Sequence, residues 1–139
     1  MTNDLRLLLD ECLQGELAEE IGKWGKVRAQ WVCEDVSLRS QSVTDEFLMS
    51  YAQARGLILV TVEGRLNERK FEICTHHGII VFKAAKRHAS AKAQIFKKLM
   101  LSGRRSLCKH AVTYLKTDEI VFRRKSPTDG ELMDIRVRI

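Results

Sequence analysis

The chain has 139 residues, of which 45% are hydrophobic, and a formal net charge of +6, which favours one globular domain over residues 1–139. Its apolar runs are too short to span a bilayer, and its first residues lack a charged lead-in to an apolar segment, so we expect a cytoplasmic protein. The four cysteines are scattered without a CxxC pair, which favours reduced thiols over a disulfide framework or a zinc site.

The first part of the chain alternates between short apolar runs and helical patterns. An apolar run over residues 5–9 is followed by residues 14–24, which place apolar side chains at helical spacing. Residues 27–33 alternate in the manner of a strand. A hydroxyl cap and acidic residues predict that the next helix begins at residues 42–45, and it stops before Gly56.

The second part continues the alternation. An apolar strand is predicted over residues 57–61, then a polar turn, a helix around residues 67–75 and a fourth apolar run at residues 78–82. A long helix is predicted from about residue 90 to 101. Three further strands are predicted at residues 111–115, 119–123 and 132–139.

Strands that alternate with helices are typical of βαβ units and of a parallel sheet covered on both faces. The central apolar runs do not alternate, as expected for strands that are buried on both sides. Residues 134–139 do alternate, as in an antiparallel edge strand with one exposed face. The sequence therefore predicts an α/β sandwich with a core at about residues 5–110 and a small antiparallel C-terminal β extension at about residues 111–139.

Carboxylates follow the predicted strands. Asp10 comes directly after the first strand, and Glu63 follows the strand at residues 57–61. Asp45 and Glu46 open the helix that leads into that strand. Sites in open α/β sheets form beyond the carboxyl ends of the strands, and carboxylate oxygens are the ligands that Mg²⁺ or Mn²⁺ prefers. The sequence thus predicts a metal site that activates water and stabilises charge on a phosphate.

Each of these acids also has a simpler explanation. Asp45 would be a favourable charge at a helix N-terminus, and Glu63 would be a solvated acid in a turn. Asp10 is different, because a carboxylate at the end of an apolar strand needs a partner.

Four short segments occur in a recognisable order: Leu7–Glu11, Thr44–Leu48, Arg55–Thr61 and Gly78–Phe82. Their succession along about residues 5–125 resembles the PIN-like domains of small prokaryotic proteins, many of which are the toxin of a toxin–antitoxin pair. The resemblance implies a three-layer α/β/α sandwich with a mainly parallel central sheet. It also implies a Mg²⁺- or Mn²⁺-dependent ribonuclease with RNA as substrate and with a cognate antitoxin or a second copy as protein partner.

The resemblance assigns roles to the acids by motif position. Asp10 matches the first acid of the family, Asp45 or Glu46 the second, and Glu63 the acid after the third strand. Glu11 and Glu46 would be auxiliary metal ligands.

The chain departs from the family pattern after the third strand. Family members typically have Thr-x-Asp-x-Asp-Phe there, whereas this chain has Thr-Val-Glu-Gly-Arg-Leu at residues 61–66. The first acid is lengthened to Glu63 and the second is replaced by Arg65, which would repel a second cation, pair with an acid or bind a phosphate. Glu68 follows shortly after Arg65 and would be the substitute metal ligand. The alternative prediction is a catalytically weakened PIN-like module that binds RNA or a protein partner, with Arg65 filling the site.

Positive charge is concentrated in the second part of the chain. Residues 83–125 hold 13 lysines and arginines against two acidic residues, whereas residues 1–82 hold 9 against 13. Such a surface suits a polyanion held mainly through its phosphates, and the simpler reading is a solvated basic helix. The predicted RNA-binding residues are Lys83, Lys86, Arg87, Lys92, Lys97, Lys98, Arg104 and Arg105.

The long helix has a predicted core face formed by Ile95 and Leu99, with Phe96 beside them. Lys92, Lys97 and Lys98 are then expected to face outward.

Two rival interpretations have less support. Residues 74–77 contain a cysteine and two adjacent histidines, but no second cluster completes a tetrahedral metal shell. A phospho-receiver domain also carries acidic residues after its first strand, but it would need an aspartate acceptor after the third strand, where this chain has Glu63.

Overall fold

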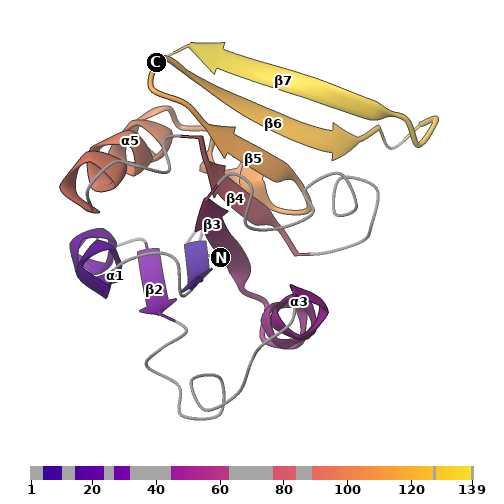
Figure 1. Ribbon diagram of the computed structural model, residues 1–139. Coiled ribbons are helices and arrows are strands. Elements are labelled where there is room, and N and C mark those ends of the chain that lie inside the picture. The colour runs from indigo at the N-terminus through magenta and orange to yellow at the C-terminus, as the bar shows by residue number, and fades with distance from the viewer. Residues whose placement is uncertain are drawn as a thin grey trace.

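A seven-stranded sheet forms the centre of the computed structural model, which describes residues 5–10, 15–23, 27–31, 45–62, 77–83, 89–126 and 128–138. The strands lie in the order β2-β1-β3-β4-β5-β6-β7 (Figure 1). Their bounds are β1 (Leu5–Leu9), β2 (Val27–Trp31), β3 (Ile58–Val62), β4 (Ile79–Phe82), β5 (Val112–Leu115), β6 (Glu119–Lys125) and β7 (Leu132–Arg138).

The sheet is parallel from β2 to β5, and β6 and β7 are added antiparallel. The predicted α/β class and the antiparallel C-terminal strands are therefore confirmed. One boundary differs: β5 pairs parallel with β4, so the antiparallel extension consists of β6 and β7 and does not begin at residue 111. The helix predicted at residues 67–75 lies outside the described residues.

In the described part of the chain, three α-helices cover the two faces of the sheet. Their bounds are α1 (Gly15–Gly22), α3 (Asp45–Ala54) and α5 (Ala89–Leu101), and a 3-10 helix, η2 (Arg105–Cys108), precedes β5. Helices α1 and α5 contact one another and pack on one face, while α3 packs on the opposite face (Figure 1). The described elements thus form three layers. None of these helices is long and apolar enough to cross a lipid bilayer.

The first three residues of strand β3 are all apolar because both faces of the strand are covered. Ile58 and Val60 pack in the core beneath α1 and α5, whereas Leu59 packs in the core beneath α3. Because successive side chains of a strand point to opposite faces, a strand with helices on both sides needs apolar residues at every position.

Strands β1 and β3 are parallel neighbours in the sheet, so their carboxyl ends lie at the same edge. After β1 the chain forms α1 on one face, and β3 is entered from α3 on the other face. In open α/β sheets, ligands bind outside the carboxyl ends of the strands. The residues at the ends of β1 and β3 are therefore the first candidates for a site.

Candidate functional site

Asp10 follows the last residue of β1, and only 1% of its surface is exposed. Its backbone N–H donates to the carbonyl oxygen of Val60 at 2.9 Å, which extends the β1–β3 ladder by one residue. The Thr61 hydroxyl donates to Oδ2 of the Asp10 carboxylate at 3.1 Å. Because a buried carboxylate must be hydrogen-bonded, paired or bound to a metal, this hydroxyl fixes the carboxylate at the end of the strand.

Asp10 and Thr61 point to the sheet face that α3 covers. Leu8 and Leu59, two residues earlier on the two strands, pack in the core beneath α3, and alternate residues of a strand share a face. Lys83, which follows β4, belongs to this face as well, since its Nζ lies 4.8 Å from the centroid of the Tyr114 ring in the same layer.

Helix α3 begins at Asp45, as the capping pattern predicts. Its last turn adjoins the start of β3, because the Leu57 N–H donates to the Ala52 carbonyl oxygen at 2.8 Å. Ten helical residues rise about 15 Å, close to the length of a five-residue strand. A helix that returns along the sheet in this way brings its first residue towards the end where Asp10 lies.

The other predicted acids lie beyond what the structure describes. Glu11 and Glu63 are outside the described residues, as is Arg65, and the side chains of Asp45 and Glu46 are not described. Asp10 is thus the predicted ligand whose side chain can be placed. Among the residues that are described, no group of three His, Cys, Asp or Glu side chains gathers into a metal site.

The prediction that Lys92 faces outward is wrong. Only 7% of its surface is exposed, because position 92 lies on the same helical face as Ile95 and Phe96, which pack in the core. The long aliphatic stem of a lysine can line such a face. Lys97 and Lys98 are exposed as predicted.

The predicted basic residues that the structure describes lie on both sides of the sheet. Lys97 and Lys98 belong to α5, which covers the face opposite to α3, and Lys98 donates through Nζ to the Thr117 carbonyl oxygen at 3.2 Å. Arg104 is exposed after α5. Lys86 and Arg87 and the side chain of Arg105 are outside what is described. Lys83 is therefore the predicted cation placed on the Asp10 face.

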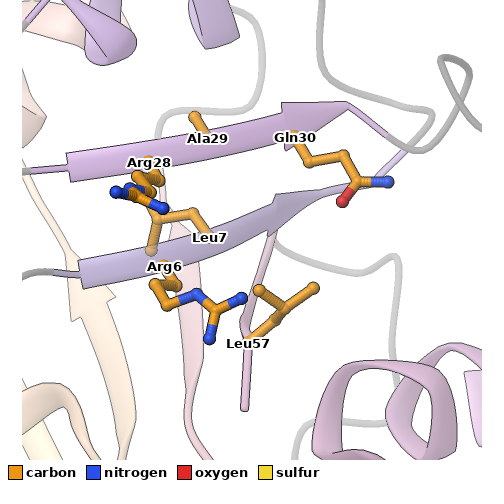
Figure 2. Close-up of a pocket in the computed structure, with 6 residues that line it drawn as sticks. All are labelled: Arg6, Leu7, Arg28, Ala29, Gln30 and Leu57. Atoms are coloured by element: carbon orange, nitrogen blue, oxygen red, sulfur yellow. The ribbon is translucent and has the colours of Figure 1, made fainter. Parts of the chain in front are cut away.

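A pair of arginines that the sequence reasoning missed lies on the α3 face. Arg6 and Arg28 are direct partners in the β1–β2 register, and both are exposed. They line a pocket of about 190 Å³ with Leu7, Ala29, Gln30 and Leu57. Figure 2 shows the two side chains side by side on adjacent strands, with Leu57 next to Arg6. The available signal was a charged residue inside each of two otherwise strand-like runs.

Positive charge extends from Arg6 to the start of β4. His77 lies there with its ring 5.5 Å from that of His110, centroid to centroid, and the His110 N–H donates to the His77 carbonyl oxygen at 2.8 Å. Burial lowers the pKa of His77, and the nearby charges of His110, Lys109 and Arg6 lower it further. Arg6 and Lys109 thus place positive charge near His77 at the start of β4.

Comparison of the chain with family models, curated proteins and solved structures finds no match.

Proposed function

We propose that this protein is a Mg²⁺- or Mn²⁺-dependent ribonuclease of the PIN-like type, with Asp10 as the central metal ligand. The observation that carries the proposal is the buried Asp10 carboxylate at the carboxyl end of β1, held by the Thr61 hydroxyl. It stands at the shared carboxyl end of the parallel strands β1 and β3, and ligands of open α/β folds bind outside the carboxyl ends of their strands.

The donor atoms at this position fit such an ion. Mg²⁺ and Mn²⁺ prefer carboxylate oxygens and water, and Asp10 offers a carboxylate whose orientation Thr61 restricts. Asp45 and Glu63, with Glu11 and Glu46, are the further ligands in this proposal. When bound, the ion would activate water and stabilise charge on the phosphate under attack.

The cations on the α3 face suggest how RNA is held. Lys83 lies beyond the end of β4 and would neutralise a phosphate close to the Asp10 end of the sheet. Arg6 precedes Asp10 by four residues, about 13 Å along a strand. Arg6 and its neighbour Arg28 would therefore bind a phosphate further along the same RNA strand. Arginine suits this role because its guanidinium can donate two parallel hydrogen bonds to one phosphate.

Cleavage of single-stranded RNA in the presence of Mn²⁺ tests the proposal. The native chain should cleave, and Asp10→Asn, which keeps the size and one acceptor oxygen, should lose at least about a hundredfold in rate. The matched control is Asp129→Asn in the exposed β6–β7 turn, which should cleave at the native rate. Full activity of Asp10→Asn, or cleavage that persists when a chelator removes the metal, would refute the proposal.

Arg65→Asp separates the ribonuclease from the weakened module. If the native chain and Asp10→Asn are equally inert while Arg65→Asp cleaves RNA, the chain is a binding module whose site Arg65 fills. If the native chain cleaves and Arg65→Asp does not improve it, the ribonuclease assignment holds.

The toxin role is part of the proposal on the strength of the family resemblance alone. It requires that the native chain, expressed in the cytoplasm, arrests the growth of the host cells and that the Asp10→Asn variant does not. Relief of the arrest by a small acidic protein encoded next to this gene would support an antitoxin partner.

A further inference from the structure

Strand β7 is the outer strand of the sheet, so one side of its backbone has no neighbour within the described part of the chain (Figure 1). Exposed sheet edges tend to pair with another strand. We propose that β7 pairs antiparallel with β7 of a second copy of this chain, which joins two sheets into one. This proposal is independent of the ribonuclease assignment.

Twofold symmetry limits the possible registers. In an antiparallel pair of identical strands, the symmetry axis passes through one residue that faces itself. A pair centred on Asp134 would oppose two carboxylates, and a pair centred on Arg136 would oppose two guanidinium groups. A pair centred on Ile135 opposes two apolar side chains. Like charges that face one another across strands are destabilising, and a pair centred on Val137 would also set Arg136 against Arg138. A pair centred on Met133 would leave most of β7 unpaired, whereas Ile135 is the middle residue of the strand. The structure therefore assigns the axis to Ile135.

The Ile135 register also matches the charges. Asp134 of one copy faces the partner's Arg136, and Arg136 faces the partner's Asp134. Within one copy, the Asp134 carboxylate accepts from Nε and Nη2 of Arg123 at 2.8 and 3.0 Å, and Arg136 donates to Glu119 at 3.0 Å. The dimer would link these two ion pairs across the interface. They lie on the α3 face of the sheet, because Val121, the partner of Arg136 on β6, packs in the core beneath α3.

The opposite face of β7 is apolar and partly open. Ile135 and Val137 pack against the core beneath α1 and α5, and 40% of Met133 is exposed. In the Ile135 register, Val137 of one copy faces the partner's Met133. The apolar side chains of the two β7 strands would therefore face one another where the two sheets join.

A pocket of about 400 Å³ lies beside Val137, at the end of α5. Leu101 lines it, and 76% of its surface is exposed. Opposed residues of paired strands have their Cβ atoms about 5 Å apart, so the partner's Met133 would reach this pocket and cover Leu101. The second copy thus supplies what covers the apolar end of α5.

Two charge variants test the pairing by sedimentation velocity over a wide range of protein concentrations. The native chain should sediment as a dimer. Asp134→Arg and Arg136→Asp should each be monomeric, because each opposes like charges across the axis. An equimolar mixture of the two variants should form a heterodimer, since each residue then faces the opposite charge. This recovery also shows that both variants are folded.

Two cysteine variants test the register. Ile135→Cys should form a disulfide-linked dimer on mild oxidation, because the two introduced thiols face one another. Val137→Cys is the matched control: its Cα lies about 13 Å from the same residue of the partner and should not cross-link above the level of the native chain. A monomeric native chain, a mixture that stays monomeric, or equal cross-linking of both cysteine variants would overturn the proposal.

Discussion

Gly78, just before β4, is a residue at which the backbone requires glycine. Its φ is 149°, and a Cβ there would lie 2.6 Å from the carbonyl oxygen of Cys108. We expect Gly78→Ala to lower the free energy of unfolding by about 2 kcal/mol or more, because the new contact is with backbone and the conformation is strained for other residues. Gly22→Ala, whose Cβ meets nothing within 4 Å, should leave stability unchanged or raise it by up to about 1 kcal/mol. Chemical denaturation compares the two variants, and equal stabilities would contradict this account.

The lowered pKa of His77 makes the stability of the protein depend on pH. Burial, with the charges of His110, Lys109 and Arg6, holds its pKa in the folded chain below the value of 6.5 expected for an unfolded one. The unfolded chain therefore binds a proton more readily, and the free energy of unfolding should fall as pH is lowered through 6.5. His77→Gln should flatten this decline in denaturation experiments between pH 5 and about pH 8. An identical decline in the variant would show that His77 does not cause it.

At the scale of elements, strand and helix positions followed from the sequence where the pattern was long and consistent. The apolar run of β3 and the start of α3 at Asp45 were predicted because burial on both faces and a helix-start pattern in the sequence leave clear signals. The direction of β5 was not, since pairing to β4 or β6 depends on the tertiary path and not on four residues of sequence. Lys92 was misplaced because its charge outweighed its position in the helical repeat.

The β1–β2 pair predicts how RNA binding depends on salt. If Arg6 and Arg28 contact phosphates, replacing either with Gln should weaken RNA binding at low salt. It should also reduce the slope of log affinity against log salt by about 0.7, the value for one phosphate contact on a single strand. Lys23→Gln removes the same charge from α1, where Lys23 pairs with Glu20 at 3.1 Å, and should change neither quantity. Binding titrations at several salt concentrations distinguish the arginines from the control.

At the scale of the whole molecule, the sequence concentrates positive charge in residues 83–125 and acids before them, and the sheet determines which of these residues meet. Asp10 was identified from its position after an apolar strand. The structure agrees with that reasoning, because Asp10 is buried at the end of β1 beside β3. The grouping of the cations was not predictable, because the two faces of a sheet draw residues from distant parts of the chain. Arg6, Arg28 and Lys83 lie on the α3 face with Asp10, whereas the α5 lysines lie opposite.

Anomalous diffraction from a crystal soaked in Mn²⁺ shows whether Asp10 binds a metal at the ends of β1 and β3. We expect a manganese peak roughly 2.0–2.6 Å from an Asp10 carboxylate oxygen, and no such peak in Asp10→Asn crystals. A soaked crystal in which manganese binds only elsewhere would rule out a metal site at Asp10.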